Sequence, residues 1–152
     1  MKIHDLIDLS LIKISLDAKT KDQAIKELAK MLQENDRVSN SKMFLENVYE
    51  RESLGSTGIG FKIAIPHTKS KYVTRPSLVF GRATKGIEFD SLDGIPAELF
   101  FMIAMPESDY NPHLKVLALL SRNLIHEEFR EQLLQAKTKE EVLSILETID
   151  KA

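Results

Sequence analysis

The 152-residue chain contains no cysteine. This absence excludes disulfides, iron–sulfur clusters, thiolate zinc sites and a cysteine nucleophile. The chain also lacks long apolar runs: the longest, residues 99–105, is strand-sized, whereas a membrane-spanning helix needs roughly 20 residues. Its first residues lack the basic and then apolar pattern of a signal peptide. These absences predict a cytoplasmic protein that does not insert into the membrane.

The chain also has no large excess of positive or negative charge. Lys and Arg number 21 and Asp and Glu number 23, which gives a formal net charge of −2. This balance argues against bulk electrostatic binding to nucleic acid or anionic lipid. The composition is that of an ordinary soluble globular protein, and the length suggests about one domain. Any chemistry must therefore come from a few local residues, and the four histidines are the first candidates.

The first third of the chain predicts one strand and two helices. Residues 11–16 alternate loosely between apolar and polar and favour a strand. Thr20 and Gln23 have the spacing of a capping box, which predicts a helix of about 15 residues. A second helix is expected to begin near Asn40. The stretch 53–60, with its three glycines, is expected to be a loop.

The remaining chain predicts strands followed by helices. Asn111 before Pro112 is typical of a helix start, with proline at the first helical position. A short helix is expected over 127–136, and Thr138 with Glu141 forms another capping box. Three apolar runs favour strands: 62–66, 78–83 and 97–105. The prediction is one α/β or α+β sandwich domain over residues 1–152, with helices on both faces of a mixed β-sheet.

His67 follows a glycine-containing stretch, a short apolar run and Pro66. Proline fixes its own backbone angle and restricts the preceding residue, so the chain leading to His67 is stiff. A neutral imidazole is a competent nucleophile near pH 7 because its reference pKa is about 6.5. From spacing alone, a loop histidine with no task is an equally good interpretation.

His113 is the second candidate. If Asn111 caps the helix, His113 lies in its first turn, where unpaired N–H groups and the helix dipole favour an anion. The same field keeps the imidazole neutral. When His113 is considered alone, the simpler interpretation is a residue at a helix start that faces solvent and has no functional role. A metal site formed by His67, His113 and a carboxylate is a weaker hypothesis, because no closely spaced ligand pair is present.

Arg51 and the glycines offer a site for phosphate without a nucleotide motif. No Gly-Lys-Ser/Thr end is present, and Gly58-Ile59-Gly60 lacks the third glycine of a dinucleotide fingerprint. Arg51 is able to pair with a phosphoryl group as a planar, multidentate cation, or simply with a nearby glutamate on the helix surface. Of the other histidines, His4 lies near a terminus and His126 is expected on a solvated corner.

Together these residues resemble a known family. Residues 51–60 (RESLGSTGIG), followed by residues 63–67 (IAIPH), look like the motif of enzyme IIA domains of the fructose–mannitol class. These domains belong to the bacterial phosphoenolpyruvate-dependent sugar phosphotransferase system. The later segment 112–117 (PHLKVL) looks like the second histidine motif of the family. Helix–strand order and length match one such domain from end to end.

The resemblance implies a role for each residue. His67 falls on the phosphorylated histidine, His113 on the histidine that assists transfer, and Arg51 on an arginine near the active site. The N–H groups of the loop with Gly58 and Gly60 are then expected to stabilise charge on the equatorial oxygens. No metal or cofactor is implied, because donor and acceptor proteins orient the group.

The resemblance also implies partners. The domain takes a phosphoryl group from HPr and passes it to a cysteine of enzyme IIB, with a membrane IIC permease downstream. We expect a phosphocarrier for a sugar, fructose-like first and mannitol or another polyol second. A regulatory, nitrogen-related enzyme IIA is the alternative, and a metal-dependent hydrolase is a third interpretation.

Two residues depart from the family pattern. Phe61 replaces a small or polar residue, and Thr68 stands where glycine is frequent, which bears on the loop shape and partner preference. Partner contact is expected around His67 through a modest apolar surface. Its candidates are Ile59, Phe61 and Met105, for each of which burial in the core is the alternative.

Overall fold

The computed structural model describes residues 2–107 and 112–151, without the side chains of Pro112 and His113. In this part of the chain, six strands form one mixed sheet in the order β1-β5-β6-β3-β2, and β4 also pairs with β6. β5 and β6 are antiparallel, whereas β3 and β4 both run parallel to β6. The strands are β1 (Ile12–Lys13), β2 (Gly58–Gly60), β3 (Ile63–Ala64), β4 (His67–Ser70), β5 (Ser77–Ile87) and β6 (Ala97–Pro106).

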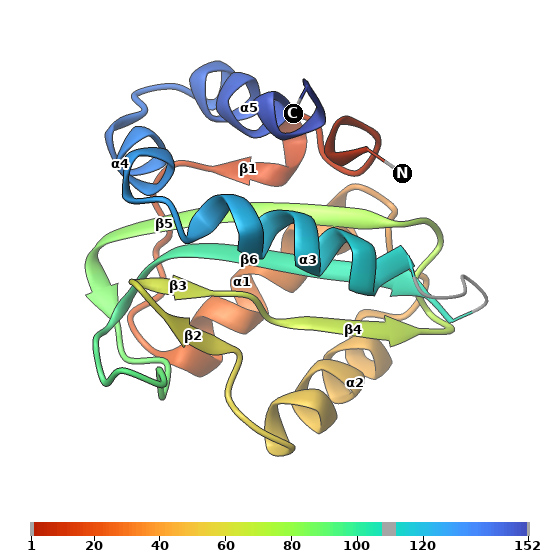
Figure 1. Cartoon of the computed structure of the whole chain (residues 1–152). Coiled ribbons are helices and arrows are strands. Elements are labelled where there is room, and N and C mark those ends of the chain that lie inside the picture. The colour runs from red at the N-terminus through yellow and green to blue at the C-terminus, as the bar shows by residue number, and fades with distance from the viewer. Residues whose placement is uncertain (1, 108–111, 152) are drawn as a thin grey trace.

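Helices cover both faces of this sheet, as predicted (Figure 1). α3 crosses the near face over β6, and α1 lies behind the sheet with α2 beside it, while α4 and α5 lie next to β1. None of the helices within the described ranges is long and apolar enough to cross a membrane. The helices are α1 (Lys21–Glu34), α2 (Ser41–Ser53), α3 (Pro112–Leu124), α4 (Glu127–Gln135) and α5 (Lys139–Glu147), with short 3-10 turns at Ile3–Asp5, Leu9–Leu11 and Thr148–Lys151.

Side-chain caps confirm three of the predicted helix starts. A side-chain oxygen of the residue before each helix accepts a backbone N–H from its first turn, which satisfies one of the unpaired donors there. The caps are Thr20 on Gln23 (3.2 Å), Asn40 on Met43 (3.1 Å) and Thr138 on Glu141 (3.1 Å). Asn111, the predicted cap of α3, lies outside the described residues.

The core is built around β5 and β6. Almost every residue of β6 is buried, which the unbroken apolar run predicted for a strand covered on both faces. Phe80 of β5 and Phe101 of β6 meet edge to face with ring centroids 5.4 Å apart. Phe89 and Phe100 make a second such contact at 5.8 Å. Edge-to-face pairs add to the stability that burial already supplies.

The structure corrects several of the predicted elements. Gly58–Gly60 is a strand, although the glycines predicted a loop. β4 was missed because His-Thr-Lys-Ser carries no apolar alternation, and it is a strand only through its pairing with β6, which is distant in sequence. β1 covers only two residues of the predicted 11–16, and β5 continues to Ile87.

The N-terminal residues are held against the C-terminal turn by hydrogen bonds. The carboxylate of Asp150 accepts the backbone N–H groups of Ile3 (2.7 Å) and His4 (2.9 Å). The His4 ring nitrogen Nδ1 lies 2.6 Å from Glu147 Oε2. The two ends therefore stabilise one another, and His4 belongs to this junction.

Candidate functional site

His67 is the first residue of β4, directly after Pro66. It pairs with Ile103 of β6, and the Ile103 N–H donates to the Pro66 carbonyl oxygen at 3.0 Å. Proline has no N–H to give to the ladder, so the run from β3 to β4 along β6 is interrupted just before His67. The His67 ring is half-buried, and its backbone is fixed by the pairing with β6.

One hydrogen bond sets the tautomer of the His67 ring. Its Nδ1 lies 2.8 Å from the carbonyl oxygen of Ile65. A carbonyl oxygen only accepts, so the hydrogen must be on Nδ1. In the neutral ring, Nε2 then carries the free lone pair. Nε2 is therefore the ring atom of His67 that is free to act as a nucleophile, a point that the sequence left open.

The pKa of His67 is lowered from its ordinary value. Burial is the largest cause, because it disfavours the charged ring. The bond to the Ile65 carbonyl opposes this shift, the positive charge of Arg51 adds to it, and the negative charge of Glu52 opposes it. The net direction keeps the imidazole neutral, and so nucleophilic, near pH 7.

Arg51 lies in the last turn of α2, the helix that packs against β4. Its Nη1 donates to the carbonyl oxygen of Gly55 at 2.9 Å, so the side chain holds the turn that follows the helix. Burial is the main cause of the lowered pKa of His67, and the positive charge of Arg51 adds to it. A guanidinium held in this way is suited to pair with an incoming anion.

The two glycines differ in what they do. The Gly58 N–H donates to Ser56 Oγ at 3.0 Å, so in this structure it is engaged within the protein, contrary to the expected availability for a bound group. A Cβ on Gly58 would lie only 2.9 Å from the Phe89 carbonyl oxygen, so a side chain has no room there. Gly60 has a φ of +96°, which favours glycine.

Glu52, next to Arg51, is a charged residue with a largely buried side chain that sequence reasoning did not single out. Its side chain is only 7% exposed and forms an ion pair with Lys21 Nζ at 2.9 Å. The carboxylate accepts the Thr57 backbone N–H at 3.2 Å and also the Thr57 hydroxyl. A signal was present, because Phe44, Val48 and Glu52 are spaced four residues apart and so share the buried face of α2.

The other histidines are placed less fully. His113 is the second residue of α3, but its side chain lies outside the described part of the structure, so its assisting role stays a prediction. His126 is exposed at the start of α4 and makes no cap there, as expected for a solvated corner. Across the described residues, no three His, Asp or Glu side chains gather as a metal ligand set requires.

The three candidates for an apolar contact surface have different fates. Met105 is fully buried in the core, Ile59 is half-buried, and Phe61 is 56% exposed. Phe61 and Lys62 both have positive φ, 56° and 66°, and form the tight turn between β2 and β3. The Arg130 guanidinium covers the Phe61 ring at 5.1 Å, a cation–π contact from α4.

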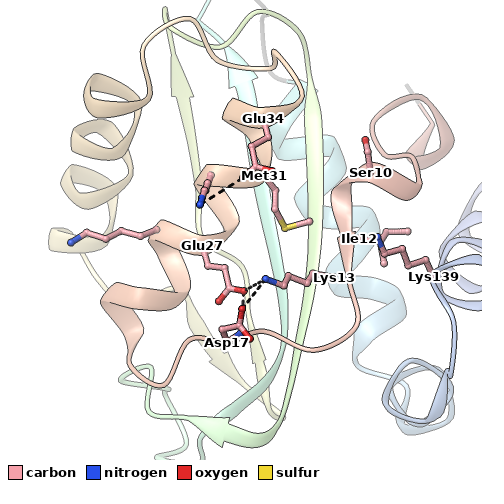
Figure 2. A pocket seen from close by; sticks show the side chains of 10 residues that line it. Ser10, Ile12, Lys13, Asp17, Glu27, Met31, Glu34 and Lys139 are labelled. Carbon is pink, nitrogen blue, oxygen red and sulfur yellow. Dashed lines mark hydrogen bonds and ion pairs between the residues drawn. The ribbon is translucent and has the colours of Figure 1, made fainter.

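A hollow of about 550 Å³ lies elsewhere, between α1, β1 and the start of α5 (Figure 2). Charged side chains line it, but many pair with each other: Lys13 Nζ lies 2.5 Å from Glu27 and 3.3 Å from Asp17. None of the candidate site residues lines this hollow. It is a surface depression bordered by ion pairs and separate from the His67 site.

Comparison with known proteins gives one family over nearly the whole chain. The family model described as "Phosphoenolpyruvate-dependent sugar phosphotransferase system, EIIA 2" matches residues 5–149. A fructose-specific EIIABC component of Bacillus subtilis is 40% identical over 99% of this chain, which spans 24% of that larger protein. A fructose-specific EIIA component of Haloferax volcanii is 40% identical, with 95% of this chain and 94% of that protein covered.

Solved structures agree in fold. The nitrogen regulatory protein IIA-Ntr of Neisseria meningitidis superposes with a TM-score of 0.89 at 32% identity, with 95% of this chain and 98% of that chain covered. The mannitol enzyme IIA of Escherichia coli, solved in complex with phosphorylated enzyme IIB, superposes with a TM-score of 0.80 at 26% identity. That match covers 92% of this chain and 96% of the other.

Proposed function

This chain belongs to the EIIA type 2 family of the phosphoenolpyruvate-dependent sugar phosphotransferase system, and we propose that His67 carries its phosphoryl group. The family makes it a phosphotransfer component. The observation that supports His67 is the bond from its Nδ1 to the Ile65 carbonyl at 2.8 Å, which leaves the Nε2 lone pair free. The lowered pKa of His67 keeps that lone pair unprotonated.

The reaction at His67 needs only one bond formed and one broken. The Nε2 lone pair attacks phosphorus as the N–P bond of the donor phosphohistidine breaks, and the electron pair of that bond stays on the donor ring. The hydrogen of His67 stays on Nδ1 throughout, where it is donated to the Ile65 carbonyl oxygen. Such a transfer depends on positioning and on stabilising charge on the equatorial oxygens.

The surrounding groups serve those two needs. Arg51 supplies positive charge for the transferred group, and its bond to the Gly55 carbonyl holds it in place. His113, in the first turn of α3, assists onward transfer near a helix end that favours anions. Gly58 acts through close packing of β2 against residues 89–91, since its N–H is already engaged by Ser56. Gly60 allows the turn to Phe61.

The donor we propose is HPr and the acceptor is a cysteine of enzyme IIB, with a IIC permease as the next component. The solved complex between a mannitol enzyme IIA and its phosphorylated enzyme IIB supports this type of partner. Fructose is the first candidate sugar, because the two relatives at 40% identity are both described as fructose-specific.

Regulation is the second candidate function. The close superposition on a nitrogen regulatory IIA-Ntr protein supports it, at a TM-score of 0.89. The sequence identity to that protein is 32%, against 40% for the fructose-specific relatives, so transport is the better supported function. Both functions use the same histidine, which makes the acceptor protein the point of difference.

A reconstituted relay tests this proposal. With phosphoenolpyruvate, enzyme I and HPr, the unmodified protein should take up label, and His67→Ala should take up none. His113→Ala should accept label but pass it on more slowly to a fructose-type enzyme IIB. His126→Ala removes an exposed histidine and serves as the matched control. Label retained by His67→Ala overturns the site assignment, whereas stable label that no enzyme IIB accepts supports the regulatory function.

A further inference from the structure

Glu52 begins a continuous set of hydrogen bonds that ends on the His67 ring. Its carboxylate accepts the Thr57 N–H and the Thr57 hydroxyl. The Thr57 carbonyl accepts the Ile65 N–H at 2.9 Å, and the Ile65 carbonyl lies 2.8 Å from His67 Nδ1. Four residues from three separate segments are thus linked from the end of α2 to the nucleophile.

We propose that Glu52 is a positioning residue for His67, acting through Thr57 and Ile65 and held in place by Lys21. The inference rests on the proposed function of His67 as the phosphoryl acceptor. Among the described residues, Glu52 has no hydrogen bond to the ring itself. Its role is to fix the Ile65 carbonyl, which keeps the hydrogen on Nδ1 and aims Nε2.

Burial makes the Glu52 contacts strong. Hydrogen bonds to an ionised acceptor are about twice as strong as neutral ones, and a side chain that is 7% exposed is poorly screened by water. Lys21 compensates the buried charge at 2.9 Å and is itself held over the Phe89 ring at 4.9 Å. Thr57 is also fully buried, so its two donors have no access to water as a substitute for the carboxylate.

Glu52 also acts on His67 through its charge. Of the described groups, Arg51 and Glu52 on α2 are the charged side chains that shift the pKa of His67, and the facing residue of β6 is the apolar Ile103. Arg51 lowers that pKa and Glu52 raises it. In a plot of the phosphoryl-acceptance rate against pH, removal of the Glu52 charge should therefore move the acid limb, where the rate falls, to lower pH. Loss of positioning should lower the plateau, which is the maximal rate reached at higher pH.

Two substitutions separate these effects. Glu52→Gln removes the charge and weakens the bonds to Thr57, so the plateau rate of acceptance from phospho-HPr should fall about tenfold to a hundredfold, with its acid limb at lower pH. Thr57→Val removes only the hydroxyl bond, so the plateau should fall while the limb stays in place. The KM for phospho-HPr should stay within about twofold in both, because neither residue reaches the surface.

Matched controls exist in the same segments. Thr57→Ser keeps the hydroxyl and should retain the unmodified rate within about twofold. Glu50→Gln removes an exposed carboxylate from the same helix and should change neither plateau nor limb. If Glu52→Gln does not fold, the comparison of Thr57→Val with Thr57→Ser tests the same bonds.

A readout without HPr separates this inference from the proposed function. Nitrogen-15 spectra of the His67 ring should show hydrogen on Nδ1 in the unmodified protein and a larger share on Nε2 in Glu52→Gln and Thr57→Val. Unchanged rates and an unchanged tautomer in those folded variants overturn the positioning role. Failure of the unmodified protein to accept label overturns the proposed function instead, and the tautomer result still reports on Glu52.

Discussion

Gly58→Ala tests whether close packing at β2 supports the site. The added methyl group would lie 2.9 Å from the Phe89 carbonyl oxygen, 2.9 Å from Ser91 Oγ and 3.0 Å from Ser91 Cα. Ordinary contacts of a Cβ begin near 3.4 Å. Two of the three neighbours are backbone atoms, so rotation of the Ser91 side chain would relieve only one contact. Relief of the other two requires β2 and residues 89–91 to separate by about half an ångström.

The energetic effect follows from that geometry. Overpacking in a well-packed region destabilises by about 1–3 kcal/mol, which corresponds to a fall in Tm of roughly 2–4 °C per kcal/mol for a protein of this size. Gly81→Ala is the matched comparison, because its methyl group meets side-chain ends of Leu16 and Leu28 at 2.8–3.0 Å. Those side chains can rotate, and the lower entropy of the unfolded alanine chain offsets about 0.4–1 kcal/mol.

Urea denaturation and the rate of phosphoryl acceptance measure the outcome. Gly58→Ala should lose more stability than Gly81→Ala and should also accept label about tenfold more slowly. The slower rate is expected because Thr57 precedes Gly58 and its carbonyl accepts the Ile65 N–H at 2.9 Å. A stability loss no larger than that of Gly81→Ala, with an unchanged rate, refutes the packing role.

Two further predictions concern the pH profile and a buried arginine. In the proposed mechanism the neutral His67 ring is the reactive form, so the rate of phosphoryl acceptance falls as pH drops through its pKa. Because burial is the main cause that lowers that pKa, the rate should persist below pH of about 6.5. Arg51→Met removes a positive charge that lowers the pKa, so the acid side of the pH profile should move to higher pH. Arg82 is 7% exposed and its Nη1 donates to the carbonyls of Leu133 (2.9 Å), Leu134 (3.1 Å) and Ala136 (2.7 Å) at the end of α4. Arg82→Met should therefore lower the free energy of unfolding, measured by urea denaturation, by about 2–4 kcal/mol. The control Arg122→Met, at an exposed arginine, should lower it by less than about 0.5 kcal/mol. Equal losses in the two variants contradict a structural role for Arg82.

Helices were easier to predict from the sequence than strands, for a physical reason. A helix start is encoded locally, so Thr20, Asn40 and Thr138 mark where their helices begin and each makes the expected cap. A strand is completed by a partner far away in sequence. β4 has a polar sequence and exists because β6 offers its backbone in register, from Ile103 to Pro106. β6 was predicted because its own apolar run requires cover on both faces.

At the candidate site, the sequence predicted which residues carry the chemistry but not their supporting contacts. His67 and Arg51 could be singled out because their side chains have reactive or anion-binding chemistry. The tautomer of His67 depends on the Ile65 carbonyl, a backbone group that no residue type reveals. The spacing of Glu52 from Phe44 and Val48 indicates only that it faces inward; its partner Lys21 lies on another helix, and the sequence does not show that contact.

The placement of Arg51 and Glu52 shows how one helix end can serve opposite needs. A phosphocarrier needs a ring exposed enough for two partner proteins, yet neutral enough to attack. Consecutive residues of a helix point about 100° apart, so Arg51 stays half-exposed while Glu52 turns inward to Thr57 and Lys21. Their charges shift the pKa of His67 in opposite directions, so burial decides the outcome. Under the proposed function, the accepting cysteine lies outside these 152 residues, because they contain none.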